Sequence, residues 1–323
     1  MCYTNQSPSI YNFIMAARTY DSSRWISKRQ FLHGKPSTPT EVSINYISCS
    51  PPNGTQSKGT ILLIHGFPQT SYQFRHVITP LADAGYLVIA PDYRGAGESS
   101  RPRDGYDKFT MAADLHTLIT SHLNIKDKIH IIGHDIGGMV AHAFAAKFPD
   151  ATASVAWGEC PLPGTSIYDQ YVKDSAHGGL WHFVFHWQLD IPEMLTQGKE
   201  RQYLKSFYDR LTQHPSAISA TDVDHYAELF AQPGAMRAGF DLYRAFHQDS
   251  EDNAKLVKEQ GKCKVPCCAL WGELSFMIEI AEEQARDMYE EVTLAKVEGT
   301  GHWCAEENPE SYVKEGLGWV GKH

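Results

Sequence analysis

The chain has 323 residues, of which 42% are apolar and 21% charged, and its formal net charge is −9. This composition is typical of a globular protein with a sizeable core. The acidic balance offers no basic surface, so we expect neither nucleic acid nor a membrane as a partner. No apolar run approaches the roughly 18 residues that a membrane-spanning helix requires.

The seven cysteines match no paired zinc-binding pattern. Cys267 and Cys268 lie inside an apolar run, which predicts buried free thiols and a reducing compartment. The N-terminus has no secretion signal, so we expect a cytoplasmic protein. A homodimer is compatible with the sequence, but nothing in the sequence determines the oligomeric state.

Predicted elements alternate between strands and helices after an irregular stretch of 58 residues. Continuous apolar runs predict parallel strands that are buried on both faces. These runs cover residues 59–65, 86–90, 128–132, 153–157, 265–271 and 292–297. Helices are predicted over residues 71–84, with Ser71 as the N-cap, and over 109–123, 139–148 and 309–321.

Residues 161–246 differ from the rest, because they contain no convincing strand and their aromatic residues recur at helical spacing. Strands that alternate with helices predict a parallel α/β sheet. We therefore predict a core of residues 1–160 and 247–323, with a helical lid of residues 161–246 inserted between two strands. In such sheets, ligands bind at the carboxyl ends of the strands.

The most informative motif is Gly-His-Asp-Ile-Gly at residues 133–137, between a predicted strand and a predicted helix. It has the form of a nucleophile elbow with Asp135 at the nucleophile position. A carboxylate that attacks a saturated carbon forms an ester, which water can cleave, whereas a serine would leave a stable ether. Asp135 therefore predicts electrophiles such as epoxides or alkyl halides, with capping of the next helix as its alternative role.

The order of these motifs resembles the α/β-hydrolase fold, and within it the epoxide hydrolases, over residues 59–320. The resemblance implies a mostly parallel, doubly wound sheet with an inserted lid, and hydrolysis of an epoxide to a vicinal diol through an ester on Asp135. It implies that His302, which follows the last strand, is the general base. It also implies an oxyanion hole formed by the backbone N–H groups of Phe67 and Ile136.

The carboxylate that would orient His302 has two candidates, Glu159 and Glu273, and each follows a predicted strand. The Glu-x-Pro-x-Pro run at residues 159–163 resembles a subgroup of epoxide hydrolases and haloacid dehalogenases that places the acid there. The resemblance therefore favours Glu159, and Glu273 stays the alternative.

The lid is expected to supply proton donors, because an alkoxide is too basic to leave unaided near neutral pH. Phe-Asp-Leu-Tyr-Arg at residues 240–244 resembles the family's Tyr-Arg lid motif and implies Tyr243 as the first donor. Leu-Trp-His-Phe at residues 180–183 resembles a subgroup that pairs a lid histidine with that tyrosine, and implies His182 as the second. The alternative role of both is packing within the lid. Weaker candidates are His186, Tyr168, Tyr171 and Tyr208.

The lid aromatics suggest a small-molecule, apolar epoxide as substrate, although they could equally form the lid's own core. We expect it to contact Phe67, Pro68, Trp181, Phe183, His186 and Trp303. No metal and no cofactor is expected, because the chain has no His-Glu-x-x-His pattern and the implied chemistry requires none.

Two other functions stay open. One is a haloacid or haloalkane dehalogenase that uses the same Asp nucleophile, and the other is a non-catalytic or repurposed binding protein. One departure argues against the first function: haloalkane dehalogenases usually carry Trp directly after the nucleophile, where this chain has Ile136. Fluoroacetate-type dehalogenases carry Arg at and shortly after that position, where this chain has Ile136 and Met139. Phe183 replaces the halide-binding Trp of the latter.

Overall fold

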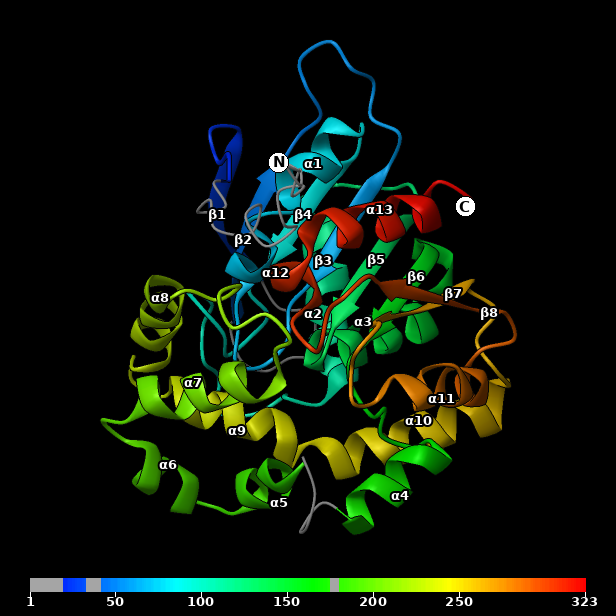
Figure 1. Ribbon diagram of the computed structural model, residues 1–323. Helices are drawn as coiled ribbons and strands as arrows, with labels where there is room; N and C mark the ends of the chain where they lie inside the picture. The colour runs from blue at the N-terminus through cyan, green and yellow to red at the C-terminus, as the bar shows by residue number, and fades with distance from the viewer. Residues whose placement is uncertain (1–19, 33–41, 175–179) are drawn as a thin grey trace, which may run out of the picture.

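The computed structural model describes residues 20–32, 42–174 and 180–323. Within these ranges eight strands form one sheet in the order β1-β2-β4-β3-β5-β6-β7-β8 (Figure 1). Their bounds are β1 Trp25–Leu32, β2 Val42–Cys49, β3 Thr60–Ile64, β4 Leu87–Pro91, β5 Ile129–His134, β6 Thr152–Gly158, β7 Cys267–Gly272 and β8 Val292–Val297. β2 pairs antiparallel with β1 and β4, and all other neighbours are parallel. The predicted α/β class with a mostly parallel sheet is confirmed.

The sheet is buried on both faces because successive side chains of a strand point in opposite directions. In β3, Leu62 and Ile64 join a core beneath one face, whereas Ile61 and Leu63 join a second core beneath the other. This arrangement explains the unbroken apolar runs in the sequence.

Helices cover the two faces and the lower end of the sheet. Their bounds are α1 Ile78–Asp83, α2 Lys108–Thr117, α3 Ile136–Lys147, α4 Ser166–Asp174, α5 Trp181–Trp187, α6 Ile191–Thr196, α7 Glu200–Leu211, α8 Ala220–Phe230, α9 Ala235–Arg244, α10 Phe246–Gln260, α11 Ala281–Met288, α12 Cys304–Glu307 and α13 Pro309–Val320. Shorter turns are η2 Ser71–Phe74, η3 Leu118–His122, η4 Pro149–Ala151 and η5 Ile278–Ile280. Helices α10, α11 and α12 were not among the predicted elements.

The prediction of an irregular N-terminal stretch was wrong in part, because residues 20–58 contain β1 and β2. β1 is an edge strand that is mostly exposed, so it carries no apolar run. In β2 polar residues such as Ser43 and Asn45 alternate with inward-facing Val42 and Ile44. Neither strand thus has the continuous apolar pattern of a central strand, and β2 follows a period of two over its first five residues.

The predicted helix over residues 71–84 is divided into η2 and α1, and Thr70, not Ser71, is the N-cap. Pro80 explains the break, because its ring clashes with the carbonyl four residues earlier and it lacks an N–H. It is therefore tolerated only in the first turn, where α1 places it. The helix predicted over residues 109–123 likewise ends at Thr117 and continues as a single π-helical turn.

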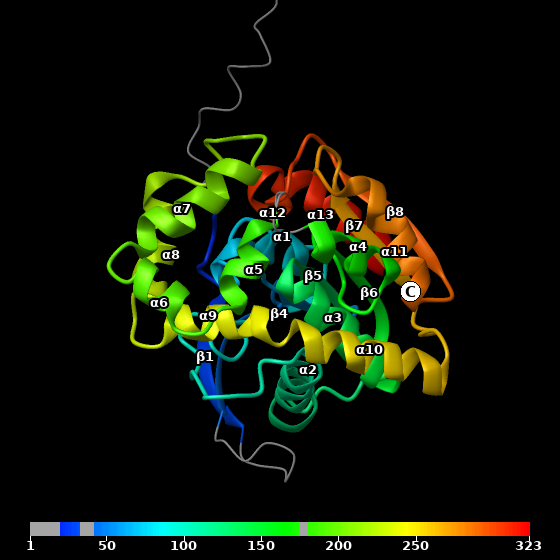
Figure 2. The ribbon, with the colours of Figure 1, turned by 90° about the horizontal axis from the view of Figure 1, so that it is seen from below.

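The described part of residues 161–246 contains helices α4 to α9 and no strand, in agreement with the helical pattern of the sequence. Figure 1 shows these helices gathered below the sheet, and Figure 2 shows them spread across its lower end. That they form a separate lid domain with the boundaries given above stays a prediction.

Two other expectations concern burial and membranes. Cys267 and Cys268 are free and buried, as predicted, while Cys2 lies outside the described residues. In the described part of the chain, no helix combines the length and apolar character needed to cross a membrane.

Candidate active site

Asp135 sits on the sharp turn between β5 and α3, with φ 55° and ψ −126°. Neighbouring glycines make this turn possible. A Cβ on Gly133 would lie 2.2 Å from the carbonyl oxygen of Gly137, and one on Gly137 would lie 2.1 Å from that of Ile64. Asp135 occupies the N-cap position of α3, but its side chain makes no capping hydrogen bond of the usual kind, to the second or third residue of the helix, so the structure does not support the alternative role as a helix cap.

Backbone N–H groups bind the carboxylate of Asp135. Phe67 N–H donates to Oδ1 over 2.8 Å, and the N–H of Ile136 also donates to this carboxylate. Gly66 allows this approach, because a Cβ there would lie 2.4 Å from the Cβ of Asp135. Burial raises the pKa of Asp135, and the charge of His302 and the two N–H groups oppose that increase.

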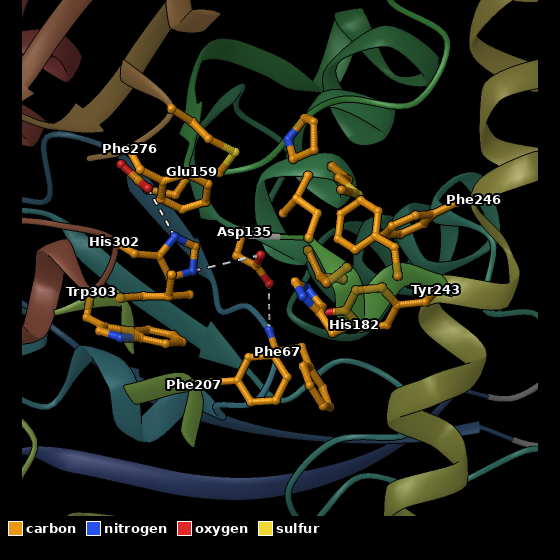
Figure 3. A pocket seen from close by; sticks show the side chains of 17 residues that line it. Phe67, Asp135, Glu159, His182, Phe207, Tyr243, Phe246, Phe276, His302 and Trp303 are labelled. Atoms are coloured by element: carbon orange, nitrogen blue, oxygen red, sulfur yellow. Dashed lines mark hydrogen bonds and ion pairs between the residues drawn. The ribbon is translucent and has the colours of Figure 1, made fainter. Parts of the chain in front are cut away.

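His302 lies between two carboxylates in the loop after β8. Its Nδ1 is 3.0 Å from Oε2 of Glu159, and its Nε2 is 4.0 Å from Oδ2 of Asp135 (Figure 3). Its carbonyl oxygen accepts a bond of 2.7 Å from Nε2 of His134, which fixes the tautomer of that neighbour. Burial acts to lower the pKa of His302, but the bond to Glu159 and the charges of Glu159, Asp135 and Glu307 raise it overall.

Glu159, which follows β6, is buried, and both of its carboxylate oxygens accept hydrogen bonds. Oε1 accepts from Gly272 N–H and Oε2 accepts from the Ser275 hydroxyl, each over 2.8 Å, in addition to the bond with His302. Glu273 is exposed, and its Oε2 accepts from the N–H of Gly299 over 3.0 Å. Of the two candidate acids, Glu159 is the one that the structure places beside His302.

Tyr243 and His182 face Asp135 from α9 and α5, and their ring centroids are 5.6 Å apart (Figure 3). Burial and the charge of Asp135 hold the pKa of Tyr243 well above its ordinary value. The phenol therefore keeps its proton near neutral pH and can act as a hydrogen-bond donor. The other lid candidates lie elsewhere: His186 Nε2 is 2.6 Å from the hydroxyl of Tyr203, and the hydroxyl of Tyr208 donates to Pro68 O over 2.6 Å. Tyr168 and Tyr171 do not line this cavity.

The space between these groups is a small cavity with mostly apolar walls. The volume open to the centre of a water molecule is about 20 Å³, roughly the amount that one water needs. Besides the five candidate catalytic side chains, the lining residues are Phe67, Ile136, Met139, Pro161, Leu180, Phe183, Phe207, Leu211, Phe246, Phe276, Met277 and Trp303. Phe276 is 49% exposed and so lies at the mouth of the cavity.

Of the six residues expected to contact substrate, Phe67, Phe183 and Trp303 line the cavity, whereas Pro68, Trp181 and His186 do not. The side chain of Trp181 is on the outer surface of α5, and that of His186 is turned toward Tyr203. Helical periodicity places His182 and His186 on one face, and both rings pack near Tyr243, with centroid distances of 5.6 and 4.4 Å, but of the two only His182 lines the cavity.

Several lining residues were missed by the sequence analysis. Phe276 and Met277 follow β7, so the rule that ligands bind at the carboxyl ends of strands could have indicated them. Leu180 and Leu211 carry no comparable signal, because an apolar residue in a lid helix is most often part of the lid's own core.

Within the described ranges, no group of three or more His, Cys, Asp or Glu side chains is arranged to hold a metal ion. The geometry brings together the carboxylate on the elbow, a histidine with a carboxylate partner, two backbone N–H groups and the side chains of Tyr243 and His182 in one enclosed space. This arrangement can attack an electrophilic carbon and then hydrolyse the ester that forms.

Known proteins resemble this chain over most of its length. A family profile of the alpha/beta hydrolase fold matches residues 59–157. The "Soluble epoxide hydrolase" of Corynebacterium sp. (strain C12) is 33% identical over 260 residues, which cover 80% of this chain and 88% of that protein. The solved "Epoxide hydrolase CorEH" is 28% identical with a TM-score of 0.80, covering 92% of this chain and 99% of its own. Cfl2 from Burkholderia cenocepacia is 33% identical with a TM-score of 0.79, covering 92% and 95%.

Proposed function

The chain belongs to the epoxide hydrolase family of the α/β-hydrolase fold, and on that basis we propose that it opens an epoxide to a vicinal diol through an ester on Asp135. The observation that carries the proposal is the placement of Asp135 between His302 on one side and the Tyr243–His182 pair on the other. These are the two sets of groups that the two steps of the reaction require.

In the first step, Oδ2 of Asp135 attacks an epoxide carbon. The C–O bond of the ring breaks, and its electron pair goes to the ring oxygen. Tyr243 and His182 donate hydrogen bonds and a proton to this oxygen. The bond from Phe67 N–H to Oδ1 supports the choice of Oδ2, because Oδ1 is already held.

In the second step, His302 takes a proton from water, and the resulting hydroxide attacks Cγ of Asp135. Negative charge develops on Oδ1, where the N–H groups of Phe67 and Ile136 are directed. The bond between Cγ and Oδ2 then breaks, and Oδ2 leaves with the diol after it receives the proton from His302. The second proton of the water, left on the new carboxyl group of Asp135, returns to the lid donor that protonated the epoxide oxygen, so every group is restored. Glu159 holds the imidazole in place and stabilises its charged form.

We propose that residues 161–246 act as a lid over this site and that the substrate is a small apolar epoxide. The mostly apolar lining supports this choice, because a charged substituent would lose its hydration without an opposite charge to replace it. Since the enclosed volume is about that of one water, substrate must displace side chains on entry, and Phe276 at the mouth is well placed to move.

The test is intact-protein mass spectrometry of the His302→Gln variant after incubation with a terminal epoxide. The expected result is a mass increase equal to one epoxide, located on Asp135 by peptide mapping, because ring opening proceeds while hydrolysis is blocked. The double variant Asp135→Asn/His302→Gln is the matched control and should gain no mass. If no adduct forms with any of a series of epoxides, the proposal is wrong.

A dehalogenase would use the same nucleophile, so the same variant should also be tested with haloalkanes and haloacids. Tyr243 favours the epoxide, because a departing halide needs no proton whereas an epoxide oxygen does. Halide release by the wild-type protein without diol formation from epoxides would favour the alternative. An adduct on Asp135 with either substrate would exclude a purely non-catalytic role.

A further inference from the structure

Glu307 lies in α12, five residues after the candidate base, and is buried. Its carboxylate accepts hydrogen bonds from backbone N–H groups on two separate segments. On the segment after α7, Gln213 and His214 donate to Oε2 over 2.7 and 3.1 Å. On the loop that carries His302, Gly301 N–H donates to Oε2 over 3.3 Å and Trp303 N–H donates to Oε1 over 3.0 Å. One buried side chain therefore joins the end of a lid helix to the residues on both sides of His302.

Direct contacts between the same two segments reinforce this junction. His302 N–H donates to the carbonyl oxygen of Leu211, the last residue of α7, over 3.0 Å. A Cβ on Gly301 would lie 2.7 Å from that oxygen, so the close approach requires glycine. Leu211 also lines the cavity, which means that the same residue faces substrate and holds the backbone of the base.

We propose that Glu307 is a positioning residue that fixes His302 against the end of α7 and thereby supports hydrolysis of the ester more than its formation. A carboxylate has about four acceptor sites, and four N–H groups bond to that of Glu307, three at Oε2 and one at Oε1. Without this acceptor, buried N–H groups on both segments would lose their partner. The four N–H donors to Glu307 lie on the loop that carries His302 and on the segment after α7, whereas ring opening depends on Asp135, Tyr243 and His182. The inference rests on the proposed function.

The negative charge of Glu307 also acts on the pKa of His302, which a purely structural residue would not do. The titratable groups that face His302 are Asp135 and His134 of the elbow, Glu159 after β6 and Glu307 on α12. Burial acts to lower the pKa of His302, and the negative charge of Glu307 is among the causes that raise it. Removing that charge should lower the pKa, so the acidic limb of the hydrolysis rate should move to lower pH.

The experiment compares Glu307→Gln with Glu306→Gln under single-turnover conditions with a terminal epoxide. Glu306 is an equally buried neighbour whose carboxylate bonds to Gln69, Tyr226 and Arg75, so its variant controls for the loss of a buried charge. Rapid quenching and mass spectrometry follow formation and decay of the ester separately. Thermal unfolding of each variant records the loss of stability.

For Glu307→Gln we expect ester decay to slow roughly tenfold to a hundredfold, the effect expected when a charged hydrogen-bond acceptor is removed. Ester formation should stay within about threefold of wild type, and the acidic limb of decay should shift to lower pH. Glu307→Asp keeps the charge but not the reach, so it should slow decay without that shift. Glu306→Gln should lower stability without either effect on decay.

Unchanged decay in Glu307→Gln, or equal slowing of formation and decay, would overturn the positioning role. If Glu307→Gln does not fold, Gly301→Ala opens the same junction while Glu307 stays in place, and it must slow decay more than formation. The proposed function fails differently, because then no ester appears even in His302→Gln.

Discussion

Phe67 N–H donates a hydrogen bond of 2.8 Å to Oδ1 of Asp135, although 68 residues separate the two in the sequence. The bond joins the loop after β3 to the elbow after β5, and these strands are direct neighbours in the sheet. It also makes the two carboxylate oxygens different, because Oδ1 is held by backbone donors while Oδ2 faces His302 and the cavity. In the proposed mechanism, each oxygen therefore has a separate task.

This difference predicts the fate of the oxygen atoms. In a single turnover in H₂¹⁸O with enzyme in excess, the first diol should carry no label, because its added oxygen is Oδ2 of Asp135. Repeated turnovers should then introduce label, because water oxygen replaces the lost one in the carboxylate. Mass spectrometry of the diol measures both. A fully labelled diol in the first turnover would indicate direct attack by water and would contradict the ester mechanism.

Removing the carboxylate of Glu159 should slow ester hydrolysis far more than removing that of Glu273. Glu159→Gln should slow ester hydrolysis by roughly 10² to 10⁴, because the imidazole loses both its orienting partner and the charge that stabilises its protonated form. Glu273→Gln removes only an exposed acceptor for Gly299 and should change the rate less than about threefold. Ester decay in single turnovers is the measurement. Equal effects of the two variants would show that Glu159 does not support His302.

The lid donors should control ring opening, not hydrolysis. Tyr243→Phe and His182→Gln should each slow ester formation by roughly 10² or more, because a donor to the epoxide oxygen is lost. Tyr171→Phe is the matched control, since this tyrosine does not line the cavity. Its rate of formation should stay close to wild type. A wild-type rate in the double variant of Tyr243 and His182 would exclude both as donors.

The two steps should respond differently to pH. Ester formation needs ionised Asp135, so it falls as the pH drops through a pKa that burial raises above 3.8. Hydrolysis needs neutral His302, so it falls as the pH drops through a pKa that contacts with Glu159, Asp135 and Glu307 raise above 6.5 despite burial. Esterification removes the charge of Asp135, which lowers the pKa of His302 in the intermediate. The charges of Glu159 and Glu307 still act to raise that pKa.

The ester should therefore accumulate on the acidic side of neutrality. Quenching steady-state reactions between about pH 5 and about pH 9 and measuring the esterified fraction by mass spectrometry tests this expectation. If the esterified fraction instead falls as the pH decreases, then protonation slows ring opening more than it slows hydrolysis, and the expectation is wrong.

The sequence alone determined the central strands and the elbow. A strand buried on both faces must be apolar throughout, and a sharp turn between strand and helix must have glycines where no side chain fits, so both leave local signals. Asp135 at the centre of that turn indicated attack on saturated carbon. Residues 20–58 show the limit of this approach, because an exposed edge strand such as β1 needs no apolar run.

Only the tertiary structure decided which side chains meet. Glu159 and Glu273 both follow strands that end at the same edge of the sheet, and the turn at Glu159, with φ 63°, directs one of them toward His302. His182 and His186 share a helical face, yet one reaches the cavity and the other Tyr203. Glu307 bonds to N–H groups about 90 residues away, for which no local pattern exists. The periodicity of a sequence indicates whether a side chain is buried. Which residue that side chain contacts depends on how distant segments pack together.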